Sequence, residues 1–224
     1  MGGRLYRATW GRLFSAIYDR SLRDAEKAGL TERRRALLAG ASGATLEIGA
    51  GTGLNLAHYP SAVSELVLAE PGEHMARRLR KSAAAAGRAL EVVEAPAERL
   101  PFEDDRFDTV VSTLVLCTVP DATAAIGEAA RVLRPGGRLL FLEHVRADDA
   151  RLARWQDRLW RPWRFVADGC HCNRDTLAAL QASPLAVDRV EHGRIEKLAP
   201  LIRPMIVGSA VAPGPQKRSR ARPP

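Results

Sequence analysis

Cysteine and long apolar runs are both scarce in this sequence. Its 224 residues include three cysteines, which excludes a scaffold held together by disulfides and favours a reducing, cytoplasmic setting. The longest apolar runs, such as that over 114–117, are far shorter than the roughly 20 residues of a membrane-spanning helix, so no transmembrane segment is expected. The first residues, Met1 to Arg4, are not followed by an apolar run with a cleavage site, so no secretory signal is expected. Hydrophobic residues make up 46% of the chain, which excludes wholesale disorder.

Lysine is also rare, and the net charge of +8 is confined to the ends of the chain. Residues 1–40 carry a net charge of +5, the last fourteen residues carry +4, and residues 41–210 carry −1. Arginine outnumbers lysine 30 to 4 and alanine is abundant, two biases that go together in proteins from GC-rich genomes. The charge is therefore weak evidence for a nucleic-acid partner. It permits a loose, salt-sensitive contact of the ends with an anionic surface such as a membrane.

The order of apolar segments predicts an α/β fold. Helical periodicity is found over 5–38, 73–86 and 121–133. Five short strands are predicted at 45–48, 66–69, 90–93, 108–112 and 138–142. Because strands and helices alternate there, we expect a parallel sheet with helices on both faces. Two further strands, at 187–191 and 205–211, have no long helix between them and are expected to form an antiparallel hairpin at the sheet edge.

These elements predict three regions along the chain. Residues 1–40 form an N-terminal helical cap, and residues 41–211 form the main domain. Residues 212–224, rich in proline, lysine and arginine, form a disordered basic tail.

The most informative motif is E-I-G-A-G-T-G, over 47–53. It follows a predicted strand and opens a helical stretch, so its glycines let the backbone turn tightly and approach a ligand closely. Neither Gly49 nor Gly51 starts the G-x-G-x-x-G spacing of a nicotinamide site, which disfavours a dehydrogenase. The carboxylate of Glu47, at the end of the strand, is suited to hold a cationic amino group of a ligand.

Three further motifs follow in order. Glu70 ends the second predicted strand, where an acid accepts hydrogen bonds from ribose hydroxyls in doubly wound nucleotide-binding folds. The loop A-E-R-L-P-F, over 97–102, follows the third strand. The turn R-P-G-G-R, over 134–138, precedes the fifth.

With these motifs in this order, residues 44–145 resemble a class I S-adenosylmethionine-dependent methyltransferase. The resemblance implies a doubly wound, Rossmann-like sheet of seven strands, mostly parallel, with S-adenosylmethionine as the cofactor. It implies cofactor contacts from Glu47, Gly49, Ala50, Gly51, Gly53, Asn55, Glu70, Pro71, Met75, Ala97, Glu98, Thr113 and Leu114. Among these, Glu70 would bind the ribose diol, and Ala97 with Glu98 would meet the adenine edge, although the family usually has aspartate where Glu98 stands.

A narrower resemblance begins after the fourth predicted strand. Residues 116–121, 142–145 and 168–175 are similar to a branch that includes the microsomal alkyl thiol methyltransferases of animals and many bacterial relatives. Those microsomal enzymes carry a hydrophobic membrane anchor, whereas this chain begins with a short Arg-rich amphipathic segment, so membrane anchoring is not carried over. A small-molecule acceptor is implied, with a thiol as the first candidate. Quinone-type C-methylation and natural-product O- or N-methylation stay open.

Candidate catalytic and substrate residues lie in these branch motifs and in the N-terminal helices. His144, at the end of the fifth strand, is a candidate general base, and Cys117 is a candidate for the acceptor pocket. Each is also compatible with a purely structural role. Candidate substrate contacts are Tyr18, Trp160, Cys170, His171 and Asn173.

Two features invite other interpretations. The C-H-C sequence over 170–172 lacks the C-x2-4-C spacing of a structural zinc site, so no metal is expected. The Trp- and Arg-rich segment 149–165 places Leu152, Trp155, Leu159 and Trp163 on one helical face, which favours a helix packed over the substrate cleft. The alternatives from other classes are a nucleic-acid-interacting protein that uses the basic ends, and a non-catalytic scaffold with a methyltransferase fold.

Overall fold

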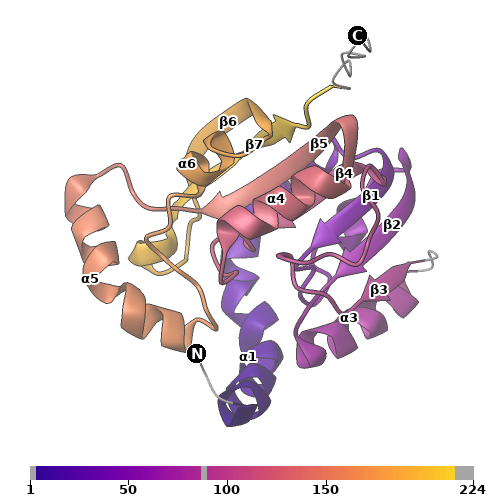
Figure 1. Cartoon of the computed structure of the whole chain (residues 1–224). Helices are drawn as coiled ribbons and strands as arrows, with labels where there is room; N and C mark the ends of the chain where they lie inside the picture. The colour runs from indigo at the N-terminus through magenta and orange to yellow at the C-terminus, as the bar shows by residue number, and fades with distance from the viewer. Residues whose placement is uncertain (1–3, 87–89, 215–224) are drawn as a thin grey trace.

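The computed structural model describes residues 4–86 and 90–214 (Figure 1). Within them, one sheet has the strand order β3-β2-β1-β4-β5-β7-β6. The strands are β1 (Gly43–Ile48), β2 (Val63–Ala69), β3 (Glu91–Val93), β4 (Phe107–Thr113), β5 (Leu133–His144), β6 (Ala186–Arg194) and β7 (Pro204–Val211). The helices are α1 (Arg4–Ala25), α2 (Thr31–Leu38), α3 (Glu73–Ala85), α4 (Ala122–Val132), α5 (Ala150–Val166) and α6 (Thr176–Gln181), with shorter turns η1 (Glu26–Leu30), η2 (Leu56–His58) and η3 (Pro200–Ile202).

The strand pairing confirms the predicted α/β fold. β1 pairs in parallel with β2 and β4, β2 with β3, and β4 with β5. β7 runs antiparallel to both β5 and β6, so the two late strands form the predicted antiparallel pair at the edge. β5 begins earlier than predicted, because Leu133 already pairs with Phe107 before a register shift leads to Arg138.

Two apolar layers, one on each face of the sheet, explain why the central strands are continuous apolar runs. One layer joins Phe141 of β5 to Ile126 of α4. The other joins Leu140, the next residue along β5, to Leu38 of α2 and Leu79 of α3. Since neighbouring residues of β5 enter opposite layers, the sheet is covered on both faces.

The N-terminal helices pack less completely than their apolar periodicity suggests. The chain turns at Gly29, whose φ of +119° separates α1 from α2. Leu13 and Ile17 of α1 are 51% and 42% exposed, so the predicted apolar face of this helix is only partly buried. Among the described residues, no helix combines the length and the apolar character needed to cross a membrane.

The predicted buried face of α5 is wrong at Trp155. This residue is 51% exposed, whereas Leu152, Leu159 and Trp163 are half-buried. The fully buried residues of this helix are Ala153 and Gln156. Gln156 takes a core position because its amide satisfies three backbone groups: it accepts from the N–H of Ala147 and donates to the carbonyls of Val145 and Leu201.

The predicted tail begins too early. Ala212 is buried, and its backbone exchanges hydrogen bonds with Gly136 and Gly137 in the turn before the long part of β5. The remainder of the predicted tail from residue 215 onward lies outside the described residues.

Candidate functional site

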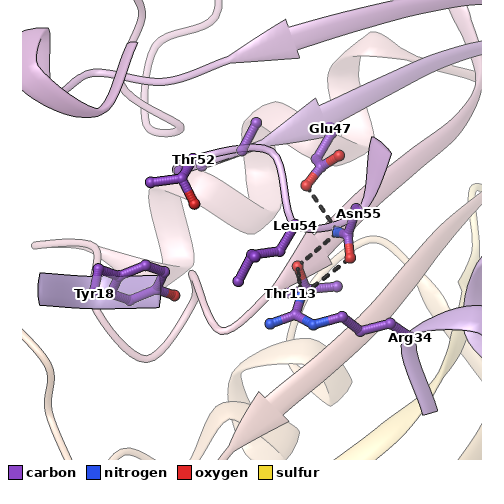
Figure 2. Close-up of a pocket in the computed structure, with 10 residues that line it drawn as sticks. Tyr18, Arg34, Glu47, Thr52, Leu54, Asn55 and Thr113 are labelled. Atoms are coloured by element: carbon purple, nitrogen blue, oxygen red, sulfur yellow. Dashed lines mark hydrogen bonds between the residues drawn. The ribbon is translucent and has the colours of Figure 1, made fainter. Parts of the chain in front are cut away.

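The candidate site lies where the strand order reverses between β1 and β4, at the carboxyl ends of these strands. Ligands bind at such a switch point in open α/β sheets because the loops on either side diverge there. A small cavity that opens to solvent occupies this position (Figure 2). It is lined by Tyr18, Arg34, Glu47, Gly49, Ala50, Gly51, Thr52, Leu54, Asn55 and Thr113.

Two glycines of the loop after β1 shape this cavity in different ways. Both Gly49 and Gly51 have a φ of +58°, which side chains disfavour. A Cβ atom on Gly49 would stand 2.6 Å from the methyl groups of Val115, so the loop after β4 packs directly against it. A Cβ atom on Gly51 would have no other heavy atom nearer than 3.9 Å, the carbonyl oxygen of Gly49. The open side of Gly51 therefore belongs to the cavity.

Glu47 places a buried carboxyl group at the inner end of the cavity. It is 2% exposed, accepts from Asn55 Nδ2 at 2.8 Å and accepts from the Tyr59 hydroxyl at 2.7 Å. Burial raises its pKa to about 7, although these two hydrogen bonds and the charge of Arg34 act in the opposite direction. A cationic ligand group beside Glu47 would favour the ionised form.

Arg34 of α2 lines the cavity and was not predicted from the sequence. It is 3% exposed, and its Nη1 donates to Asn55 Oδ1 and Thr113 Oγ1, both at 3.1 Å, as Figure 2 shows. Its Nε donates to Glu26 Oε1 at 2.9 Å. The guanidinium group and the Glu47 carboxyl group thus lie on either side of Asn55, and both line the cavity.

Helix α1 lies over the cavity, next to the glycine loop (residues 49–53). Tyr18 lines it, and burial raises the pKa of Tyr18, so its hydroxyl stays protonated. The neighbouring Asp19 accepts from Thr52 Oγ1 at 2.5 Å and from Arg78 Nη2 at 2.9 Å. One carboxylate therefore connects α1 to the glycine loop and to α3.

Glu70 lies next to the cavity without lining it. Its two carboxylate oxygens accept from the backbone N–H of Gly51 at 2.9 Å and of Gly72 at 2.8 Å. Burial raises the pKa of Glu70, and the two backbone donors at Gly72 and Gly51 partly offset this effect. The acid thus connects the end of β2 to the glycine loop.

The other predicted cofactor residues lie around the ends of the strands, outside the cavity lining. Gly53 packs against Leu56, Ala97 is buried, and Glu98 accepts from the N–H of Asp121 at 3.3 Å. Leu114 has a φ of +60°, a conformation that few residues with a Cβ adopt. Pro71 lies just before α3 and Met75 in its first turn, and their predicted cofactor contacts stay predictions.

The predicted catalytic residues His144 and Cys117 do not line the cavity. His144 Nε2 lies 2.9 Å from Cys170 Sγ, and burial raises the pKa of the Cys117 thiol well above its usual range. Glu143, also missed from the sequence, organises the loop beside them. Its buried carboxylate accepts from Ser112 Oγ at 2.7 Å and from backbone N–H groups at 115–117.

The remaining predicted substrate residues join α5 to the loop after it. The rings of Trp160 and His171 stack with centroids 5.4 Å apart. Burial, with the charges of Arg174 and Arg164, lowers the pKa of His171 to about 4, so this imidazole is neutral. Asn173 Nδ2 donates to Asp157 Oδ1 at 3.1 Å. None of these side chains lines the cavity between β1 and β4.

Comparison with known proteins identifies the family of this chain. The methyltransferase-domain family matches residues 46–141, the region that holds the glycine loop, Glu70 and the loop after β4. The structure of YcgJ from Bacillus subtilis superposes with a TM-score of 0.66 at 18% identity, covering 83% of this chain and 100% of YcgJ, a likeness of fold alone. The chain belongs to the class I S-adenosylmethionine-dependent methyltransferases. The non-catalytic scaffold hypothesis therefore does not hold.

Within this family the chain is similar to thiol S-methyltransferases. It is 33% identical over 205 residues to thiol S-methyltransferase TMT1A of Homo sapiens, covering 88% of this chain and 82% of that protein. It is 37% identical over 181 residues to TMT1B of Homo sapiens, covering 78% and 73%. A shorter match, 41% identical over 78 residues and 35% of this chain, is to 28% of the ubiquinone/menaquinone biosynthesis C-methyltransferase UbiE of Bartonella tribocorum.

Proposed function

We propose that this chain transfers the methyl group of S-adenosylmethionine to a thiol on a small molecule. The assignment of S-adenosylmethionine as the methyl donor rests on one observation, a pair of oppositely charged side chains at the cavity. Glu47 and Arg34 are both almost fully buried, and both line it. Glu47 has no ion-pair partner among the described residues, whereas Arg34 is already paired with Glu26 through Nε. A zwitterionic ligand would supply the missing cation to Glu47 and a second anionic partner to Arg34.

The methionine end of S-adenosylmethionine has that pattern of charge. In the proposed complex its ammonium group donates to Glu47, and its carboxylate accepts from Arg34. The open side of Gly51 leaves room for the chain between the amino acid and the sulfonium. Glu70 would accept from the ribose hydroxyls through the lone pairs that its two backbone bonds leave free.

The acceptor half rests on the similarity to the thiol S-methyltransferases and on the absence of His144 from the cavity lining. In the reaction, the bond between sulfonium sulfur and methyl carbon breaks while a bond between that carbon and the acceptor sulfur forms. S-Adenosylhomocysteine leaves, and the thiol proton is lost to solvent. A free thiol with a pKa near about 8.5 is partly ionised at neutral pH, so it needs little help from a base. The contribution of the protein is alignment and exclusion of water.

Calorimetry tests the cofactor assignment first. Titration with S-adenosylmethionine and S-adenosylhomocysteine should give heat, and NADH should give none. Glu70→Ala should weaken binding by about 1–3 kcal/mol, because charge-assisted hydrogen bonds to ribose are lost. Glu73→Ala is the matched control, since Glu73 is 70% exposed and paired with Arg77 on its own helix. No heat with either adenosyl ligand, or equal affinities for the two variants, would refute the assignment.

A panel of acceptors tests the thiol. Methyl-labelled cofactor is incubated with alkyl thiols, phenols, amines and quinols, and labelled product is counted. Labelled thioether alone supports the proposal. Quinone-type C-methylation is the second candidate because of the match to UbiE, and label in the quinol arm alone would replace the thiol by a carbon acceptor.

A further inference from the structure

A second set of chemically reactive side chains meets behind the loop that follows β4. Cys117 comes from that loop, His144 from the end of β5, and Cys170 from the loop after α5. One ligand atom from each, two thiol sulfurs and an imidazole nitrogen, lie within 4.8 Å of one another. The three residues are 1%, 4% and 7% exposed.

Hydrogen bonds outside the cluster hold the loop of Cys117 and the loop of Cys170 together. The N–H of His171 donates to the carbonyl of Cys117 at 2.8 Å. Arg174 Nη1 donates to the carbonyls of Leu116 at 2.6 Å and Val119 at 2.7 Å. These hydrogen bonds keep the loops that carry Cys117 and Cys170 side by side.

The imidazole of His144 turns its Nε2 atom toward the cluster. His144 Nε2 lies 2.9 Å from Cys170 Sγ, and Nδ1, the other ring nitrogen, is buried and has no hydrogen-bond partner among the described residues. Nε2 is therefore the ring nitrogen placed to bind a metal together with the thiols. The adjacent Glu143, by contrast, has four donors on its carboxylate.

Two thiolates and one imidazole are a donor set that zinc prefers. Zinc in a tetrahedral site has sulfur ligands at about 2.3 Å and nitrogen ligands at about 2.0–2.1 Å, so its ligand atoms stand roughly 3.5–3.8 Å apart. The present separations, from 2.9 Å to at most 4.8 Å, need only small side-chain shifts to reach those values. Trp163 Nε1 also donates to Cys170 Sγ at 3.2 Å, the kind of outer hydrogen bond that steadies metal ligands.

We propose that Cys117, His144 and Cys170 bind one zinc ion and leave one coordination position for a ligand from outside the cluster. The sequence predicted no metal, because the local C-x-C spacing is wrong, and Cys172 indeed stays out of the site. Its thiol is fully buried and donates to the carbonyl of Gln156 at 3.7 Å. The ligands come instead from three distant segments. The site would adjoin the cofactor cavity, because Thr113, four residues before Cys117, lines that cavity.

The test uses the full chain, purified under reducing, anaerobic conditions, stripped with a chelator and titrated with zinc and with cobalt in the absence of cofactor. One equivalent should bind, and cobalt should give thiolate-to-metal charge-transfer absorption with tetrahedral d–d bands. This measurement needs no variant, so poor folding of a mutant cannot obscure it. No charge-transfer band in the wild-type chain would overturn the proposal.

Variants then assign the ligands. Cys117→Ser, Cys170→Ser and His144→Ala should each weaken zinc binding by at least about 100-fold, since even outer-shell changes reach that size. Cys172→Ser is the matched control and should bind as the wild type does. Zinc should raise the Tm of the wild type and of Cys172→Ser, but not that of Cys117→Ser. Equal loss of binding in Cys172→Ser, or full binding in Cys117→Ser, would contradict the ligand set.

Discussion

Removing the buried charge of Arg34 perturbs the stability and the cofactor affinity of this enzyme together. In Arg34→Met the volume of the side chain is largely kept, while the ion pair with Glu26 and the bonds to Asn55 and Thr113 are lost. The carboxylate of Glu26 is 17% exposed and would keep only its bond from the Thr31 hydroxyl.

The size of the effect follows from the burial of both partners. Breaking a buried ion pair destabilises a protein by about 3–5 kcal/mol. Because Glu26 is partly accessible to water, we expect the lower end, about 3 kcal/mol, for the free energy of unfolding. Loss of one charge-assisted bond to the methionine carboxylate should weaken S-adenosylmethionine binding by about 1.5–3 kcal/mol, or roughly 10- to 150-fold.

Urea unfolding and calorimetry measure the two quantities separately. Arg35→Met is the matched control on the same helix: Arg35 is 60% exposed and bonded to Glu32, so its loss should change stability by less than about 0.5 kcal/mol. Arg34→Lys keeps the charge and should recover part of the affinity. If folded Arg34→Met bound the cofactor as tightly as Arg35→Met, the proposed contact with the carboxylate would be wrong.

Three further predictions concern the loop region. Cofactor affinity should rise between pH 5.5 and 7.5, because Glu47, with a pKa of about 7, must ionise to hold the ammonium group of the cofactor. The affinity should fall again above about pH 8, because the ammonium group then loses its proton. Calorimetry across this range should show no acid limb for Glu47→Gln, and a flat wild-type profile would refute the contact. Glu143→Gln should lower the unfolding free energy by about 1–3 kcal/mol, measured by urea, because an amide presents one acceptor oxygen where the carboxylate presents two. Gly49→Ala should weaken cofactor binding more than Gly136→Ala. Both substitutions strain a positive φ, but the new Cβ at position 49 meets Val115, whereas the new Cβ at position 136 has no heavy atom within 4 Å. Equal cofactor affinities in the two variants would contradict this.

The sequence predicted the sheet well because a buried parallel sheet leaves a strong apolar pattern. It also predicted the cavity residues in and next to one continuous motif: Glu47, Gly49 and Gly51 of the motif and Asn55, two residues after it, all line the cavity. Such residues lie close in space because they are close along the chain.

Residues that enter from other segments were harder to predict. Arg34 lies within three consecutive arginines, where a charged, solvent-facing role is the usual expectation. Its spacing from Leu37 and Leu38, which are both buried, was the available signal, because residues three and four apart share a helix face. The cluster of Cys117, His144 and Cys170 leaves no local spacing at all, since each ligand comes from a different segment.

In α5 the prediction of buried residues failed for a different reason. Periodicity assigned Trp155 to the buried face, whereas the polar Gln156 occupies it. A hydropathy pattern contains no information on the backbone N–H of residue 147 and the carbonyls of residues 145 and 201, which the Gln156 amide satisfies by both accepting and donating hydrogen bonds.

The position of β7 affects how the chain can assemble during synthesis. β7 pairs with β5 on one side and with β6 on the other, and both of those strands are made before it. Until residues 204–211 have emerged, the apolar strand β5 has an open hydrogen-bonding edge, and β6 has no place in the sheet. An open apolar edge readily pairs with another copy of the same chain. Because the last strand made is inserted between two earlier strands, the nascent chain is more prone to aggregation than the finished enzyme.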